Sequence, residues 1–540
     1  MTAEDVAGSP STRPTEPRTA VAIAILVLIV AAPRLALLPL NENLFGDAIP
    51  RTELAERWIA QPHLITAFGD GAGQFGPLHL YLIGLATTVT DREIAGRWIS
   101  LFCGLLTVVP LYRLARRVAG WQAAIVASLA LAVWGLHIQF STTAASEALT
   151  ILLVMSALDA FSAAIATGRA AALAWAALWL NLAAAVRYDA WMYPVVLAAC
   201  VLLMRREPTL SAARLAGFLA ASAIVPLLWM AGNHQMHGDA LFPFHFINAE
   251  HRRWATTAYP DFWREQWLRL QGLGFWPAIA LVSLTPGVAV LATVGAIAAW
   301  RDRPGDRWLI VTLAAPVAYF AVRTSVFADF VPLARFMAIA LALMLIFVWD
   351  GHQAIVGRWG SGRARSIARA TLVLAIAMPL TIGAFTFRRD SYVADVMRPL
   401  SPTSTNSRAV MAAAAFLRAE VVDGGRRVLI DSDDRYADLP LVFYGRLETD
   451  RVLRVRAPGG LEQASDIGPD LVVRFDHGSL ARSRSVRLSG NTLSIGQATY
   501  VELNGFSPPV HVYRRQSGTG SGSARPPDHR PDQPLVQMVR

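Results

Sequence analysis

Long apolar stretches separated by short polar segments recur along the first 390 or so residues. A helix needs about 20 mostly apolar residues to cross the hydrocarbon core of a bilayer. The first stretch, residues 19–40, is longer than a signal-peptide core and lacks a small-residue cleavage site, so we expect a retained span. Ten further spans are expected at residues 94–115, 121–138, 143–166, 170–186, 190–204, 212–231, 276–300, 308–322, 333–349 and 370–387. The pattern predicts a polytopic α-helical membrane protein with about eleven transmembrane helices.

One apolar segment, residues 77–90, is short and begins with proline. Counting it as a span would place the arginine clusters of all later loops outside. Leaving it out places them on the cytoplasmic side, as the positive-inside rule favours: Arg116, Arg117, Arg169, Arg205, Arg206, Arg301, Arg303 and the stretch 358–369. We therefore interpret residues 77–90 as an interfacial or re-entrant helix. The N-terminus is then cytoplasmic and the C-terminal region lies outside a plasma (inner) membrane.

Polar segments divide the rest of the chain. Residues 1–18 are polar and rich in Pro, Ser and Thr, which is typical of a disordered cytoplasmic N-terminus. Residues 19–387 form the predicted transmembrane domain, with outer loops at 41–93 and 232–275. Residues 388–515 are expected to be an extracytoplasmic α/β domain, since a helix-like stretch at 407–421 precedes short β-like runs at 427–430, 471–473 and 510–513. Residues 516–540, rich in Gly, Ser and Pro, are expected to be a disordered tail.

Composition supports this interpretation. Hydrophobic residues make up 54% of the 540 positions and charged residues only 16%, whereas a soluble domain carries roughly a quarter charged residues. The net charge of +10 is better explained by cytoplasmic topology signals than by nucleic-acid binding. The two cysteines, Cys103 and Cys200, lie in apolar runs, so neither a disulfide framework nor a cysteine metal site is expected.

Two acids stand out at the outer ends of predicted spans. Asp47 follows the first span within a few residues and precedes a helix-like segment at 50–58. It could therefore be a helix N-cap, or it could be a functional acid. Glu147, in the sequence STTAASEAL, could equally be a first-turn acid stabilised by the helix dipole. Two carboxylates at one membrane face would suit acid–base or metal-assisted transfer.

Three arginines at the outer face, Arg97, Arg187 and Arg335, run against the positive-inside trend. Each could simply extend to lipid headgroups. Arginine is also well suited to bind phosphate through two parallel hydrogen bonds, so an anionic lipid phosphate is a candidate ligand. The pair His234 and His237 has metal-ligand spacing, but Gly238 and Pro243 interrupt its helix.

The order of these features resembles the GT-C glycosyltransferases that use polyprenyl-phosphate sugars, closest to the protein O-mannosyltransferase and aminoarabinose transferase type. The resemblance is carried by short sequences in the same order: GDA at 46–48, GPLHLY at 76–81, AGRWIS at 95–100, RYDAW at 187–191, GDALFP at 238–243 and RF at 335–336. The family usually has two adjacent acids where this chain has only Asp47. A divalent metal is therefore left open, and no other cofactor is expected.

The resemblance implies an inverting transfer of a hexose or pentose from a polyprenyl-phosphate donor to an acceptor hydroxyl on a lipid, glycan or protein. Asp47 would be the general base and Glu147 a second catalytic acid. The donor phosphate would be held by Arg335, Arg97 and Arg187, and the substrate by His79, Tyr81, Tyr188 and Asp189. Membrane lipids are expected partners and nucleic acid is not. A transporter or flippase of a lipid-linked or anionic substrate is the alternative, although transporters usually carry polar residues deep in mid-span and inverted repeats.

Overall fold

The structure is a computed structural model that describes residues 19–40, 47–203, 210–357, 362–386, 408–431, 438–447, 450–455, 460–476, 478–508 and 510–516. The predicted N-terminal segment and tail, at 1–18 and 517–540, lie outside these residues. The chain divides into two compact units, Met1–Met411 with Arg435–Tyr444, and Ala412–Asp434 with Gly445–Arg540. Each unit is considered by itself.

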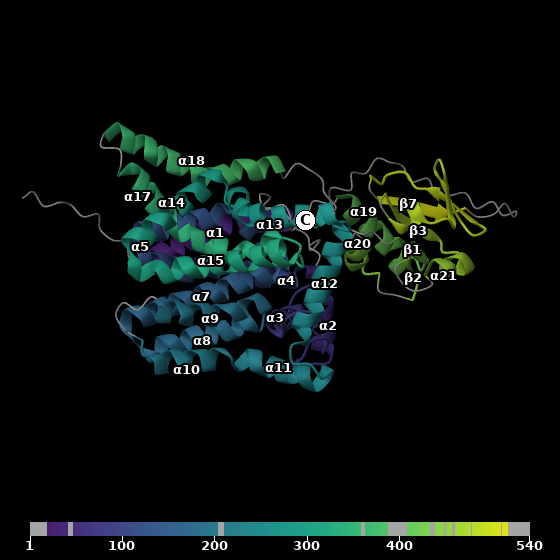
Figure 1. Cartoon of the computed structure of the whole chain (residues 1–540). Coiled ribbons are helices and arrows are strands. Elements are labelled where there is room, and N and C mark those ends of the chain that lie inside the picture. Colours follow the sequence, from purple (N-terminus) through teal and green to yellow (C-terminus); the bar gives the residue numbers. More distant parts are fainter. Residues whose placement is uncertain are drawn as a thin grey trace, which may run out of the picture. The chain divides into compact units, whose positions relative to one another are not determined.

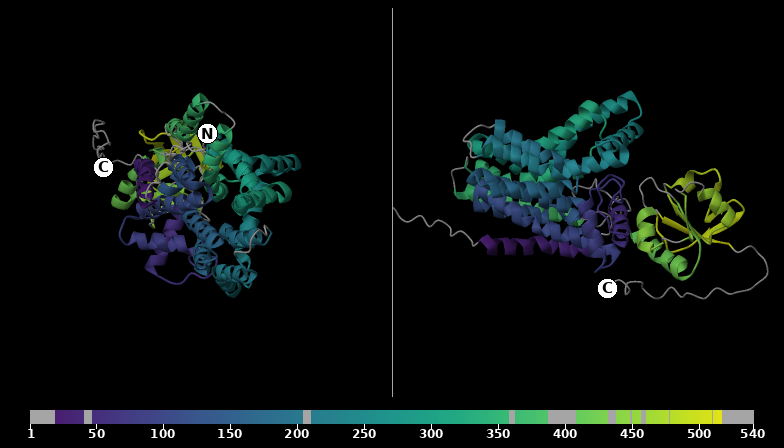
Figure 2. Two further views of the ribbon diagram at one scale, coloured as in Figure 1. Left: turned by 90° about the vertical axis from the view of Figure 1, so that its left-hand side faces the viewer. Right: turned by 90° about the horizontal axis from the view of Figure 1, so that it is seen from below.

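The first unit is helical, and its long helices run roughly parallel to one another (Figures 1 and 2). The shorter helices α2 and α12 lie across one end of these long helices (Figure 1). The helices are α1 (Thr19–Leu37), α2 (Ala48–Ala60), α3 (Pro77–Thr87), α4 (Arg92–Leu106), α5 (Val108–Val133), α6 (Gly135–Thr142), α7 (Ser146–Thr167), α8 (Ala170–Ala184), α9 (Met192–Leu203), α10 (Ala212–Ser222), α11 (Ile224–His237), α12 (Phe242–Ala258), α13 (Phe262–Ser283), α14 (Pro286–Asp302), α15 (Arg307–Val322), α16 (Ala338–Met344), α17 (Val348–Val356) and α18 (Gly362–Thr386). Short turns include η2 (Tyr188–Trp191), η4 (Arg323–Phe327) and η5 (Ala334–Met337).

Among the described residues, five helices are long and apolar enough to cross a membrane, or up to seven if each of two bent helix pairs is one span. Other predicted spans correspond to shorter apolar helices, such as α8 and the η2–α9 segment. Helix α3 has only 11 residues, too few to cross, as expected for segment 77–90. The structure thus confirms a multi-pass helical protein, and the count of eleven spans stays a prediction.

The predicted span at 276–300 is not one continuous helix. Helices α13 and α14 meet there at 114°. Pro286 starts α14 at a position where its missing N–H costs nothing, and Thr285 before it has a φ of 68°. The outer loop predicted at 232–275 is also largely helical, because it contains the end of α11, all of α12 and the start of α13.

Arg34 shows how this unit buries a charge where helix α5 ends. The side chain lies on α1 and is fully buried. Its guanidinium donates to the carbonyl oxygens of Leu131 and Ala132 at 3.0 and 3.2 Å. Those carbonyls lie in the last turn of α5, where no later N–H of the helix can reach them. His137 Nδ1 lies 2.6 Å from the same guanidinium, so one arginine fixes the junction between α1, α5 and α6.

The second unit contains a seven-stranded mixed sheet in the order β2-β1-β3-β7-β6-β5-β4. β1 pairs in parallel with β2 and β3, and the other pairs are antiparallel. The strands are β1 (Val428–Ile430), β2 (Val452–Arg454), β3 (Leu471–Phe475), β4 (Val486–Ser489), β5 (Thr492–Ile495), β6 (Ala498–Glu502) and β7 (Val510–Arg515), and the helices are α19 (Arg408–Leu417), α21 (Gly460–Ile467) and α22 (Ser479–Arg482). Helix α20 (Asp438–Gly445) belongs to the first unit, apart from its last residue. This confirms the α/β class, with β1, β3 and β7 at the predicted β-like runs.

Helices α14 and α17 cross at unusually short distance because each presents a glycine to the other. A Cβ on Gly295 would lie 1.9 Å from the carbonyl oxygen of Phe347, and one on Gly351 would lie 1.8 Å from that of Leu291. Small residues at such crossings let helices pack closely inside a membrane, where association depends on van der Waals contact.

We predict that Gly351→Ala forces α14 and α17 apart and destabilises the folded protein by about 1–3 kcal/mol. Gly217→Ala in α10 is the matched control, because nothing lies within 4 Å of a Cβ built there. Thermal unfolding of both variants in one detergent measures the difference. Equal transition temperatures for the two variants would contradict the close crossing of α14 and α17.

Candidate active site

A cavity of about 570 Å³ opens at the end of the helical unit crossed by α2 and α12. Its wall carries charged side chains, namely Asp47, Arg51, Arg187, Asp189, Glu250, Arg323 and Arg335. Aromatic side chains lie among them, including Phe75, Tyr188, Trp191, Phe244, Phe246, Trp254, Phe320, Phe330 and Phe336. The volume lies in the range of small-molecule sites.

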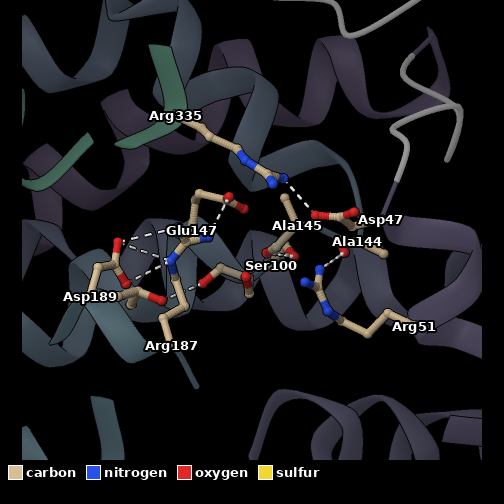
Figure 3. Close-up of polar contacts among 11 residues, drawn as sticks. Asp47, Arg51, Ser100, Ala144, Ala145, Glu147, Arg187, Asp189 and Arg335 are labelled. Atoms are coloured by element: carbon tan, nitrogen blue, oxygen red, sulfur yellow. Dashed lines mark hydrogen bonds and ion pairs between the residues drawn. The ribbon is translucent and has the colours of Figure 1, made fainter. Parts of the chain in front are cut away.

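Asp47 immediately precedes α2 but does not act as its N-cap, because its side chain accepts no hydrogen bond from the helix N–H groups. Its carboxylate instead accepts from Nη1 of Arg335 at 2.5 Å (Figure 3). The two residues are 288 positions apart. The structure therefore does not support the N-cap interpretation of Asp47, and its functional role stays a prediction.

Arg187 bridges two further acids from its place before η2. Its Nη1 donates to Glu147 Oε1 at 2.8 Å, and its Nε donates to Asp189 Oδ1 at 3.0 Å (Figure 3). Glu147 is 2% exposed, and its Oε2 has no hydrogen-bond partner among the described residues. A buried carboxylate is tolerated only when paired, so Arg187 is what allows Glu147 to lie there.

Electrostatics at the site favour the charged forms. Burial raises the pKa of Asp47, but the charges of Arg335 and Arg51 outweigh it and hold the pKa below its ordinary value. For Arg187, burial lowers the pKa, and the charges of Asp189 and Glu147 more than offset this, so the pKa is raised. Asp47 and Arg187 are thus both ionised at neutral pH.

Arg51 and Arg323 also face the cavity, and neither was among the predicted site residues. Arg51 lies one turn into α2 with its guanidinium 4.2 Å from the ring centre of Phe75. Arg323 donates to Asp329 at 2.8 Å and to the hydroxyl of Tyr319 at 3.1 Å. Arg323 follows the predicted span 308–322 at its outer end, so the topology argument that selected Arg187 and Arg335 could have found it. Arg51 had no comparable signal.

His251 was also missed. It lies in α12 between aromatic rings, 4.2 Å from the ring centre of Phe330, and its Nδ1 has no partner among the described residues. Residue 251 was predicted to lie in a polar outer loop, and only the helical path of α12 brings it to the cavity wall.

Besides Glu147, three predicted site residues do not line the cavity. Arg97 is buried and donates to the carbonyl oxygens of Thr142 and Leu38. His79 is 1% exposed. The hydroxyl of Tyr81 accepts from the backbone N–H of Ile65 at 2.7 Å. These positions indicate structural roles, whereas Asp47, Arg187, Tyr188, Asp189 and Arg335 do line the cavity and Glu147 lies directly behind it.

The described residues of this site do not form a cluster of metal ligands. In the described ranges, which omit residues 41–46, no three His, Cys, Asp or Glu side chains come close enough to hold an ion. The carboxylate of Asp47 is engaged by a guanidinium instead. We therefore assign no step to a metal.

Comparison with protein families gives one match. The family described as dolichyl-phosphate-mannose-protein mannosyltransferase matches residues 74–230, a segment that includes α3 to α10, Arg187 and the first half of α11. No curated protein sequence matches the chain.

Solved structures with the same fold extend over most of the chain. ArnT from Cupriavidus metallidurans bound to undecaprenyl phosphate is 14% identical, with 94% of this chain and 99% of that one covered and a TM-score of 0.52. The apo form of ArnT is 15% identical over 92% and 97%, with a TM-score of 0.51. The apo oligosaccharyltransferase of Archaeoglobus fulgidus is 16% identical over 84% and 69%, with a TM-score of 0.52. The chain therefore has the fold of the GT-C glycosyltransferases, as its sequence resemblance predicted.

We predict that Arg187→Met destabilises the protein by about 3–5 kcal/mol, because it leaves Glu147 buried without a counter-charge. Glu147→Gln should cost much less, since Arg187 keeps Asp189 as a partner. The double variant should recover much of the stability lost in Arg187→Met. Thermal unfolding of the three variants tests this, and an Arg187→Met protein as stable as Glu147→Gln would contradict it.

Proposed function

We propose that this chain is a membrane glycosyltransferase that transfers a sugar from a polyprenyl-phosphate donor to an acceptor hydroxyl at the extracytoplasmic face. The observation that carries the proposal is the pairing of Asp47 with Arg335 in a cavity lined by charged and aromatic side chains. Such a transfer needs a base for the acceptor hydroxyl and a phosphate-binding group in one cavity. The bound undecaprenyl phosphate of ArnT, a structure with the same fold, agrees with a lipid phosphate as ligand.

The donor is a phosphate diester with one negative charge, and the lipid phosphate that leaves carries up to two. Negative charge therefore grows on the phosphate as the bond between the anomeric carbon and its oxygen breaks. Guanidinium groups fixed near that phosphate stabilise the transition state more than the ground state, which is the condition for faster reaction. Arg335 and Arg187 are placed for this role, and Arg323 lines the same cavity.

Asp47 is proposed as the general base. As the acceptor oxygen attacks the anomeric carbon, its proton passes to the Asp47 carboxylate, and the electron pair of the broken bond leaves with the phosphate. A single displacement of this kind inverts the anomeric centre. The low pKa of Asp47 keeps the carboxylate ionised before the reaction, so it is ready to accept the proton. Glu147 acts indirectly, by fixing Arg187.

Both roles require the Asp47–Arg335 pair to open when substrates bind. The phosphate oxygens then accept hydrogen bonds from the Arg335 guanidinium, and the acceptor hydroxyl donates a hydrogen bond to the Asp47 carboxylate. The side chains of Arg335 and Asp47 are 17% and 23% exposed, so an incoming phosphate can reach Arg335.

The decisive experiment uses the full-length protein reconstituted in vesicles with a radiolabelled polyprenyl-phosphate sugar and candidate acceptors. Asp47→Asn should lower the transfer rate by about 10²–10⁴-fold while polyprenyl phosphate binds at least as tightly, because the carboxylate that pairs with Arg335 is removed. Asp261→Asn is the control, since Asp261 caps α13 and lies outside the cavity lining. Unchanged transfer by Asp47→Asn would overturn the assignment of the base. Movement of the lipid across the bilayer without transfer would instead indicate a flippase.

The lowered pKa of Asp47 also predicts a pH dependence. A carboxyl group with a pKa below its ordinary value of about 3.9 stays ionised throughout the physiological range. The wild-type kcat/KM should therefore not fall between pH 8 and pH 5 through protonation of Asp47, and an acid limb due to this residue should appear only below about pH 4. An acid limb with an apparent pKa near 6 that disappears in Asp47→Asn would contradict the prediction.

A further inference from the structure

A second groove of about 480 Å³ runs along the outside of the helical unit, between α4–α5, α7 and α8. It is distinct from the first cavity. Ser146, at the start of α7, lines the first cavity, whereas the second groove is lined by Asp159 on the same helix. At about 1.5 Å per residue, the 13 residues between them correspond to about 20 Å.

The walls of the groove are apolar. Leu106, Val109 and Pro110 form one side, and Trp175 and Trp179 of α8 form the other. Trp175 is 56% exposed, and its ring lies 6.2 Å from that of Trp179. Exposed indoles on a helix surface are typical of a protein face in contact with lipid.

The length of the groove matches half a bilayer. Its α7 lining extends from Leu152 to Ala163, which is about 16 Å along the helix axis. The hydrocarbon core of a membrane is about 30 Å thick, so one leaflet contributes about 15 Å. One lipid chain therefore fits along the groove from the bilayer centre to the interface.

Positive charge gathers at one end of the groove. Nε of Arg113 lies 3.0 Å from Asp159 Oδ2, and Nη1 of Arg117 lies 2.7 Å from Asp159 Oδ1. Two arginines thus share one carboxylate, which leaves one unit of positive charge in excess. The side chain of Arg113 is 54% exposed, so N–H groups beyond the one that meets Asp159 face the surroundings. The sequence places this end of the unit at the cytoplasmic side.

We propose that this groove is a binding site for an anionic phospholipid of the cytoplasmic leaflet, with one acyl chain along the apolar walls and the headgroup phosphate on Arg113 and Arg117. Basic pockets between membrane helices at the cytoplasmic side favour anionic headgroups in this way. The excess charge selects an anionic over a zwitterionic lipid. The site is independent of the proposed catalysis.

The test measures lipids retained by the full-length protein in native mass spectrometry, with phosphatidylglycerol and phosphatidylcholine titrated separately. Wild type should bind phosphatidylglycerol more tightly, and Arg113→Gln should weaken that binding about fivefold. The control Arg301→Gln removes an exposed arginine of α14 outside the groove and should have no effect. Arg113→Gln keeps Arg117 on Asp159, so the buried acid stays paired and the fold is preserved.

A second pair of variants tests the acyl-chain part. Ala163→Phe fills the groove and should also weaken phosphatidylglycerol binding, whereas Ala174→Phe, on the exposed face of α8 outside the groove, should not. Equal affinity for the two lipids would overturn the proposal. So would phosphatidylglycerol binding that is unchanged in both Arg113→Gln and Ala163→Phe. Displacement of phosphatidylglycerol by equimolar polyprenyl phosphate in wild type but not in Ala163→Phe would also overturn it, since the carrier lipid would then be the occupant.

Discussion

Charges buried away from water must be paired, and this requirement organises one end of the helical unit. Arg335 pairs with Asp47, and Arg187 pairs with Glu147 and Asp189. These residues come from η5, the start of α2, the start of α7 and η2, which are far apart in sequence (Figure 3). Each pair is stable only if all of these segments reach the same place. The pairing that makes the fold stable is therefore also what assembles the proposed site.

The backbone segment before α7 is held by hydrogen bonds from side chains of other helices. Thr143 and Ala145 have extended backbone between α6 and α7, and carbonyl oxygens of this segment accept hydrogen bonds from side chains of other helices. Arg97 donates to the carbonyl oxygen of Thr142. Ser100 Oγ donates to the carbonyl oxygen of Ala145 at 3.0 Å, and Arg51 Nη1 donates to that of Ala144 at 3.4 Å. These contacts fix where α7 begins, and Glu147 lies in its first turn. Arg97, predicted to hold phosphate, thus positions the segment that carries Glu147.

Periodicity and charge predicted the class of fold, because apolar length and arginine distribution are properties of single segments. They failed where neighbouring residues changed the path, as at Thr285-Pro286, which splits one apolar run into α13 and α14. Asp47, Arg187 and Arg335 were predictable from their outer position, whereas Arg51 was not. The distinction between Arg187, which faces the cavity, and Arg97, which faces backbone carbonyls, depends on packing between distant helices and has no local signature. The wall formed by α12, with His251, was missed for the same reason.

The central claim is that one ion pair, Asp47 with Arg335, opens to receive a lipid phosphate. A cryo-EM structure of the full-length protein with bound polyprenyl phosphate tests it most directly. We expect a phosphate oxygen within hydrogen-bonding distance of the Arg335 guanidinium, and the Asp47 carboxylate released toward the cavity. A lipid phosphate bound elsewhere, with the Asp47–Arg335 pair intact, would contradict the account.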